Sequence, residues 1–595
     1  MADSNAASAS STPSMGAPSG GSKDNSASGS SSRAFKNPRQ SGRKRGKGGK
    51  QTGRADFERM KENNKREGGT GDWRDFKRRK VNGGEDGASK NPFSKEEIEA
   101  EQKRPKRKVA VMVGYSGTGY RGMQINGDEP TIERDLFRAF IAAGAISKAN
   151  ADDHRKSSLI RCARTDKGVH AAGNIISLKL IIEDEDIVDK INDALPEQIR
   201  IWGIQRTNNS FNCYHECDSR WYEYLMPSYT LLPPNPRSFL GQSVQEYAKL
   251  HNVEAELEEK FADVKDFWSD VEENGVKPVL ERLDPEIRAK ALERISSEDF
   301  DLVNEKGESK PESTENSAAA TEGTDKATSD EQAATTSSEG AEVPEGSLKP
   351  KKRELGPLDY ALRDIKMAYV SAKRKYRVSP ERLQRLQEIL TKYEGTHNFH
   401  NFTVQKAFKD PSAKRHIKSF VVNPEPIIIG DTEWLSLKVH GQSFMMHQIR
   451  KMVSLAVLMV RCGTPLDRVR ESYLEQKMAI PKVPGLGLLL ERPVFDMYNR
   501  KAKDSLGKET LDFGKYEERL EAFKRKHIYN RIFDVEEKEN AFHSFFNQVD
   551  QFKQNHFLWV TAGGMAVAKI EGQGQALADK QLGDEDEEDV EGGEG

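Results

Sequence analysis

The chain has 595 residues, of which 32% are charged and only 35% are hydrophobic. A chain of this length can hold several domains, but the low fraction of hydrophobic residues means that part of the chain cannot form a packed core. It has no apolar run long enough to span a membrane, no signal-type N-terminus and only four cysteines. We therefore expect neither a membrane-spanning nor a secreted, disulfide-rich protein, but one from a reducing compartment.

The net charge of −2 averages over segments of opposite sign. Residues 1–107 predict a disordered basic arm whose clusters, such as Arg43-Lys44-Arg45 and Lys77-Arg78-Arg79-Lys80, are typical of nuclear import or of RNA binding. Residues 245–354 predict an acidic, largely disordered insertion in a surface loop, with a helix-prone first part. A helical C-terminal extension is expected over 501–570, followed by an acidic disordered tail over 571–595.

The first globular segment, 108–244, mixes strands and helices. An apolar strand at 109–113 comes before a helix that begins at Thr131, and further strands flank the loop 161–171. A helix at 186–191 is followed by strands at 200–204 and 221–225. The order β-α-β-β-α-β-β predicts an α+β fold of ferredoxin-like type.

The second globular segment, 355–500, again mixes both kinds of element. A helix is predicted to begin at Ser379-Pro380, with strands at 417–422 and 434–439. A long apolar helix is expected over 444–461, with Ser443 as its N-cap. Two related α+β halves around a shared cleft follow from this pattern.

The loop 161–171 carries one carboxylate, Asp166, among the cations Arg161, Arg164 and Lys167. A charged loop between two strands fits a catalytic loop in which Asp166 serves as nucleophile or base. The alternative is a surface turn with a local ion pair, which contributes little. Arg450 lies beside the apolar stripe of the long helix, where it needs a carboxylate partner unless its side chain extends to solvent.

Three further patterns leave alternatives open. Arg220, Tyr222 and Tyr224 share one strand face, suited either to stacking on a nucleobase or to a core. The G-x-G-x-x-G motif at 117–122 follows a strand but does not open a helix, so a dinucleotide site is disfavoured. The segment 213–217 spaces Cys213, His215 and Cys217 on one strand face; structural zinc needs four ligands, and the alternative is two buried thiols and a histidine.

Taken together, six segments resemble the tRNA pseudouridine synthases of the bacterial TruA type, and most closely their eukaryotic nuclear, fungal-type branch. The resemblance covers roughly residues 108–235 and 355–495, and it depends on all segments occurring in order. They are Val113–Tyr120 with Gly122 and Gln124, Ala163–Ala171, Arg220–Tyr224, Tyr393–Phe399 with Phe402, Phe444–Val453 and Pro484–Leu488.

The resemblance implies a role for each site residue. Asp166 stands where the family has its catalytic aspartate, and Arg164 matches the arginine linked to flipping the target base. Tyr222 matches the tyrosine that stacks on uracil, Arg450 the arginine paired with the aspartate, and Leu488 an apolar residue of the pocket. The implied fold is a pseudouridine synthase fold, in which two ferredoxin-like halves form a mixed or antiparallel sheet around a central RNA-binding cleft.

The implied function is isomerisation of specific uridines to pseudouridine in tRNA, in the anticodon stem and loop region such as positions 27 and 28. Small nuclear RNA and mRNA are further expected substrates. The reaction needs no cofactor, the expected partners are RNA and import receptors, and both a monomer and a homodimer stay open. The expected location is the nucleus, with cytoplasm or mitochondria as additional sites. A non-catalytic RNA-binding protein of the same fold is the alternative, disfavoured because binding alone does not require a paired Asp166.

Overall fold

The computed structural model of this protein describes residues 91–296, 356–404 and 406–568. The basic clusters before residue 91, the acidic stretch 297–355 and the acidic tail lie outside these residues. Within the described part, no helix is both long and apolar enough to cross a membrane.

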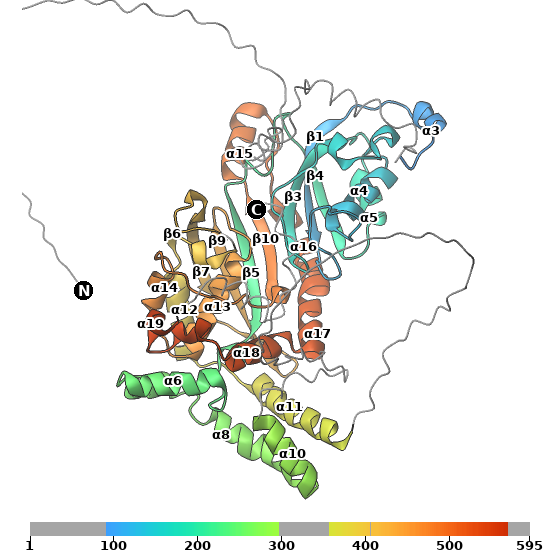
Figure 1. Cartoon of the computed structure of the whole chain (residues 1–595). Helices are drawn as coiled ribbons and strands as arrows, with labels where there is room; N and C mark the ends of the chain where they lie inside the picture. Colours follow the sequence, from blue (N-terminus) through green and yellow to red (C-terminus); the bar gives the residue numbers. More distant parts are fainter. Residues whose placement is uncertain (1–90, 297–355, 405, 569–595) are drawn as a thin grey trace, which may run out of the picture. The chain divides into compact units, whose positions relative to one another are not determined.

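Ten strands form one sheet, which is the scaffold of the molecule (Figure 1). Their order is β4-β1-β3-β10-β5-β9-β7-β6, with β2 on β3 and β8 on β9. The strands are β1 Arg107–Tyr115, β2 Ile160–Arg161, β3 His170–Leu180, β4 Ile199–Arg206, β5 Ser219–Pro227, β6 Gly395–Asn398, β7 Lys414–Val422, β8 Ile427–Ile429, β9 Thr432–Gly441 and β10 Leu488–Val494.

The predicted α+β class and the mixed sheet are confirmed, and the first half has the expected order β-α-β-β-α-β-β. The two halves nevertheless share one sheet. β10, from the second half, lies between two strands of the first: it pairs parallel with β3 and antiparallel with β5. This insertion brings the loop before β3 close to the residues that precede β10, although they are separated by some 300 positions in the chain.

Seventeen α-helices are found in the described residues. They are α3 Lys95–Ala100, α4 Ile132–Ala142, α5 Ile187–Asp193, α6 Phe239–Leu250, α7 Glu254–Lys260, α8 Phe267–Val271, α9 Lys277–Glu281, α10 Pro285–Ser296, α11 Pro357–Lys375, α12 Pro380–Thr391, α13 Gln448–Arg461, α14 Arg468–Glu471, α15 Asp496–Lys501, α16 Glu517–Phe523, α17 Asn530–Glu539, α18 Ala541–Gln551 and α19 Gly564–Val567.

One segment expected to be disordered contains a helix, and the helix-prone first part of the insertion is helical as predicted. Short helix α3 lies in the predicted basic arm, where Ser94 and Glu97 form a reciprocal capping box. In the insertion, α7 to α10 occupy residues 254–296, and part of this group packs with α11 around a small apolar core of Val271, Val276, Ala291, Leu362, Ile365 and Tyr369. Apolar side chains too sparse to suggest a domain in the sequence meet here because helices place them on one face.

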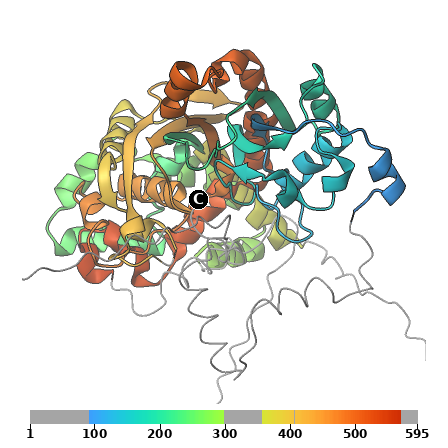
Figure 2. The same cartoon turned by 90° about the horizontal axis from the view of Figure 1, so that it is seen from above.

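The C-terminal extension covers one face of the sheet. Glu223, on β5, accepts a hydrogen bond from the Tyr529 hydroxyl at 2.5 Å, and Glu491, on β10, pairs with Lys524 at 2.9 Å. Neighbouring residues on a strand point to opposite faces, so Tyr222 faces away from this helical cover. Figure 2 shows the same elements from above, with the two halves on either side of the shared strands.

Helix α13 begins later than predicted. Ser443 is not its N-cap; the cap is His447, whose backbone is left-handed at φ 61°. The buried Gln448 side chain accepts a hydrogen bond from the Met445 N–H at 2.9 Å, which holds residues 445–448 in a turn. Because of this turn the helix begins only at Gln448, directly after His447.

Candidate active site

The Asp166 loop is held from outside by the glycine motif. The Met123 N–H donates to the Thr165 carbonyl at 3.1 Å, and the Gly168 N–H donates to the Tyr120 carbonyl at 3.3 Å. Gly122 adopts φ +99°, and a side chain there would bring a Cβ atom to 2.8 Å from the Thr165 carbonyl oxygen. No helix follows the motif until α4, so the glycines serve close packing against the loop and not a pyrophosphate.

The loop is held from below by buried side chains of β1 and β3. The Tyr115 hydroxyl and the Thr165 hydroxyl form a hydrogen bond of 2.8 Å, and the Asn174 amide donates to the Ala163 carbonyl at 3.0 Å. Tyr115 is fully buried, and this burial raises its pKa to about 12, so its hydroxyl stays protonated. The residues on either side of Asp166 are thus fixed while its own side chain remains accessible.

The Asp166 carboxylate is 31% exposed and lies 3.5 Å from His447, measured from Oδ2 to Nδ1. Burial raises the pKa of Asp166, but the hydrogen-bonding and electrostatic interaction with His447 and the positive charges of Arg450 and Lys482 outweigh it, so the pKa is lowered overall. The carboxylate is therefore ionised and surrounded by cationic or hydrogen-bonding side chains from the second half of the chain.

Arg450 lies in the first turn of α13, 5% exposed. Its Nε donates to the Val483 carbonyl at 2.7 Å, and its guanidinium packs on Gly485, where a Cβ would lie 3.7 Å from Cζ. The predicted pairing with Asp166 is present as an electrostatic interaction, because the charge of Arg450 is one cause of the lowered pKa of Asp166. A further contact joins the Asp166 carboxylate to His447, a residue to which no role was assigned from the sequence.

Tyr222 lies on β5, one of the central strands, and its side chain is 8% exposed. Its ring meets the Phe444 ring edge-on, with centroids 5.2 Å apart. Burial raises the pKa of Tyr222, and the negative charge of Asp166 contributes to this shift. The tyrosine predicted to stack on uracil and the predicted catalytic carboxylate thus lie within electrostatic reach of each other.

Leu488, the first residue of β10, is 7% exposed and pairs across the strands with Tyr224. The Tyr224 hydroxyl donates to the Pro484 carbonyl at 2.7 Å. Together with the Arg450–Val483 bond, this contact ties the segment 483–488 to both β5 and α13. Leu488 is therefore positioned next to the tyrosine strand but opposite Tyr224 and not Tyr222.

Arg164 is exposed, two residues before Asp166. Partial burial lowers the pKa of its guanidinium, to which the neighbouring charge of Arg161 contributes, while Glu133 acts in the opposite sense. Glu133 is fully buried on α4 and pairs with Arg161 at 2.5 Å. The carboxylate of Glu133 thus interacts with two cations of the loop, Arg161 and Arg164, whereas the groups that act on Asp166 come from the second half of the chain.

The cysteine segment does not form the strand face expected for zinc. Residues 213–216 form turns, and among the described residues no group of three or more His, Cys, Asp or Glu side chains could hold a metal. Cys213 is buried, and contact with the Cys162 thiol lowers the pKa of Cys217 to about 7. The zinc alternative therefore has no support, because a turn between β4 and β5 separates the three side chains that a strand would have aligned.

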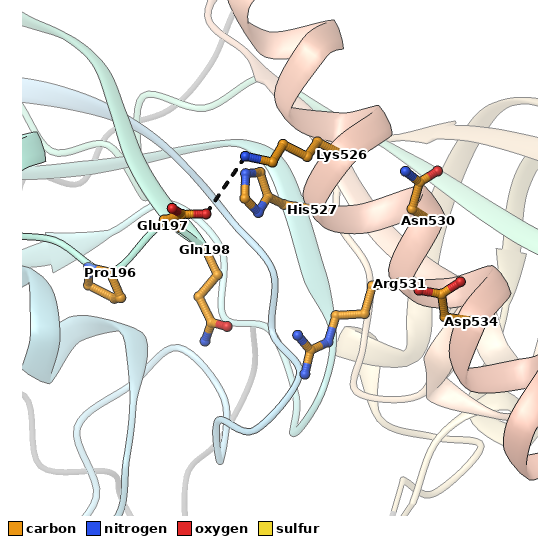
Figure 3. A pocket seen from close by; sticks show the side chains of 8 residues that line it. All are labelled: Pro196, Glu197, Gln198, Lys526, His527, Asn530, Arg531 and Asp534. Carbon is orange, nitrogen blue, oxygen red and sulfur yellow. Dashed lines mark ion pairs between the residues drawn. The ribbon is translucent and has the colours of Figure 1, made fainter.

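A separate cavity of about 340 Å³ lies between the start of β4 and the C-terminal extension (Figure 3). Two acidic and two basic side chains line it, and one pair of them, Lys526 and Glu197, is bridged at 3.7 Å. Its lining contains none of the predicted site residues; it is formed by Pro196, Glu197, Gln198, Lys526, His527, Asn530, Arg531 and Asp534.

Comparison with known proteins agrees with this arrangement. A sequence model described as tRNA pseudouridine synthase matches residues 389–496. The chain is 43% identical over 532 residues to tRNA pseudouridine synthase 1 of Schizosaccharomyces pombe, covering 88% of this chain and 97% of that protein. It is 42% identical over 517 residues to the protein of the same name from Yarrowia lipolytica, covering 86% of each.

A third relative, tRNA pseudouridine(27/28) synthase of Saccharomyces cerevisiae, is 34% identical over 442 residues, covering 74% of this chain and 98% of that protein. The matched lengths cover 74–88% of this chain in these three comparisons. The chain therefore belongs to the tRNA pseudouridine synthases. It is an isomerase that acts in pseudouridine synthesis and tRNA processing.

Proposed function

We propose that Asp166 starts the isomerisation of a flipped uridine and that Arg164, Tyr222, Arg450 and Leu488 bind or orient the nucleotide around it. The observation that carries the proposal is the position of Asp166: a fixed loop presents its ionised carboxylate at a partly open site formed by both halves of the chain. A surface ion pair, the alternative reading of this loop, would not require cations from α13 and from the segment before β10.

The chemistry suits these groups. The C1′–N1 bond of uridine breaks, the uracil turns, and C1′ bonds to C5. C5 then loses its proton and N1 gains one, so no redox change occurs and no cofactor is required. Asp166 acts by attack on C1′, by attack on the base or by removal of a ribose proton; each route requires the carboxylate form.

The target base must first leave its stack, which costs a few kcal/mol. Stacking on an aromatic ring contributes roughly 1–3 kcal/mol per base and offsets part of that cost. Tyr222 is the aromatic residue suited to this role, because it faces away from the helical cover and lies within reach of the Asp166 charge. Arg164 is exposed and can occupy the space that the flipped base leaves.

The substrate positions belong to the same proposal. One relative is named for positions 27 and 28 of tRNA, and we infer that this chain also modifies the anticodon stem region. Small nuclear RNA and mRNA segments that present a similar helical stem are further proposed substrates. The basic clusters of the N-terminal arm support a nuclear location. A fluorescent fusion that lacks residues 1–90 tests this proposal and is expected to stay outside the nucleus.

The test uses tRNA labelled with tritium at C5 of uridine. Wild-type protein should release the label, because C5 loses its hydrogen when it bonds to C1′. The Asp166→Asn variant should bind the same tRNA and release no label. Label release by Asp166→Asn at the wild-type rate would contradict the role of Asp166. Mapping pseudouridine in the product, with tRNA altered at positions 27 and 28 as the control, tests the proposed sites separately.

A further inference from the structure

His447 contacts the Asp166 carboxylate from the second half of the chain, and no pattern in the sequence pointed to it. Its Nδ1 lies 3.5 Å from Asp166 Oδ2, and its side chain is only 4% exposed. This distance is long for a hydrogen bond, but catalytic contacts are often long in a free enzyme and shorten when the substrate is bound.

The backbone of His447 is held in an unfavourable conformation. Its φ of 61° and ψ of 0° lie in or near the left-handed region, which residues other than glycine adopt rarely, asparagine, aspartate and histidine more often than the rest. Strain of this kind persists where the surrounding structure enforces it, and it occurs often at functional sites. Here the Gln448–Met445 hydrogen bond and the Lys451 N–H, which donates to the His447 carbonyl at 3.0 Å, fix the turn.

The imidazole of His447 does not cap helix α13. As N-cap of α13, His447 makes no hydrogen bond from its side chain to the first turn. Its Nδ1 has no hydrogen-bond partner within the described residues, so the atom that faces Asp166 has no competing structural contact. A residue kept for helix capping would be Ser, Thr, Asp or Asn with its side chain on the helix backbone.

Position 447 also explains how α13 presents two groups to one carboxylate. His447 and Arg450 are three residues apart at the beginning of α13, and both act on the Asp166 carboxylate. Arg450 donates a hydrogen bond to the Val483 carbonyl and also acts on Asp166 through its charge, and Nδ1 of His447 lies beside Asp166 Oδ2. The other groups that face Asp166 electrostatically are Lys482, from the segment before β10, and Tyr222, from β5.

We propose that His447 is a positioning residue, which holds the Asp166 carboxylate in its reactive orientation through Nδ1 while the left-handed turn at the start of α13 fixes the ring. The proposal rests on the proposed role of Asp166. It adds a residue from the opposite half of the chain, so that the reactive carboxylate is oriented only when both halves are assembled.

Three variants separate positioning from a structural role. His447→Ala removes the ring, His447→Gly removes the ring and also the backbone strain, and His447→Asn keeps a side-chain N–H donor on a residue that tolerates the left-handed conformation. Misplacing a reacting group by about 1 Å costs up to roughly 100-fold in rate. We expect a loss of about 10- to 100-fold in kcat for Ala and Gly, with unchanged tRNA affinity, and partial recovery for Asn.

Two readouts distinguish the outcomes. A merely structural histidine predicts that the Gly variant, which melts at a higher temperature than the Ala variant, is also the more active one. The positioning role predicts that both lose kcat equally and that the acid limb of their rate profile moves to higher pH, because a group that favours ionised Asp166 is gone. Wild-type kcat and an unshifted acid limb in His447→Ala would overturn the proposal.

These results stand apart from the test of Asp166. If Asp166→Asn is inactive and His447→Ala is fully active, the proposed function holds and the positioning role fails. If Asp166→Asn releases label as fast as the wild type, the proposed function itself fails, whatever the His447 variants do.

Discussion

Gly122 offers a direct test of how the Asp166 loop is fixed, because the chain contains its matched control. Gly122 and Gly119 belong to the same glycine motif and both have positive φ, +99° and +87°. A Cβ at position 122 would lie 2.8 Å from the Thr165 carbonyl oxygen, whereas a Cβ at position 119 would meet nothing within 4 Å. The two alanine variants therefore share backbone strain but differ in contact with the loop.

The strain is expected to cost about 1–3 kcal/mol of the free energy of unfolding in each variant. The contact adds a second effect in Gly122→Ala alone. To reach the ordinary contact range that begins at 3.4 Å, the Thr165 carbonyl must move by about 0.6 Å, and Asp166 is the next residue. Since an error of about 1 Å in placement costs up to roughly 100-fold in rate, we expect Gly122→Ala to lose about 10- to 100-fold in kcat.

The assay combines urea unfolding with single-turnover release of tritium from 5-tritiated tRNA, at a temperature where both variants are folded. Gly119→Ala should unfold at lower urea than the wild type but keep its kcat. Gly122→Ala should lose stability and kcat together. Equal kcat values for the two variants would refute the conclusion that the glycine motif positions the Asp166 loop.

Variants at three other residues probe the remaining parts of the site and its scaffold. Tyr222→Ala should lose about 1–3 kcal/mol of stacking free energy, or roughly 5- to 150-fold in kcat/KM, whereas Tyr222→Phe should keep most of the wild-type kcat/KM. Equal losses in the two variants would assign the role of Tyr222 to its hydroxyl and not to its ring. Arg450→Leu should move the acid limb of kcat/KM to higher pH, because the Arg450 charge helps to lower the pKa of Asp166 and the active carboxylate is lost as pH falls through that pKa. An unmoved acid limb would show that Arg450 acts only on Val483. Arg461→Met should lower the free energy of unfolding, measured in urea, by about 3–5 kcal/mol and leave kcat unchanged. The reason is that Asp550 of α18 stays buried but loses the two hydrogen bonds, of 2.6 and 2.7 Å, that Arg461 donates to it. A kcat loss as large as that of Arg450→Leu would instead place Arg461 in the site.

Much of the local structure was accessible from the sequence because it depends on neighbours in the chain. Apolar periodicity located β1, α4, β3, α5, β4 and β5 in the right order, and Ser379-Pro380 marked the beginning of α12. The start of α13 was misplaced because the apolar pattern continues through residues 444–447, while the hydrogen bond from Met445 to the Gln448 side chain bends them into a turn. The zinc alignment failed for a similar reason: period-two spacing has meaning only on a strand, and 213–216 form turns.

The sequence by itself determined the family, which the comparisons confirm, and through the resemblance to that family it predicted Asp166, Arg164, Tyr222, Arg450 and Leu488 as the site residues. Only the tertiary structure decided how they meet. β10 enters between β3 and β5 by pairing across distant parts of the chain, and no local pattern encodes such pairing. That insertion brings the first turn of α13 to the Asp166 loop, so the contact with His447, which joins two halves of the chain, became visible only in the folded protein.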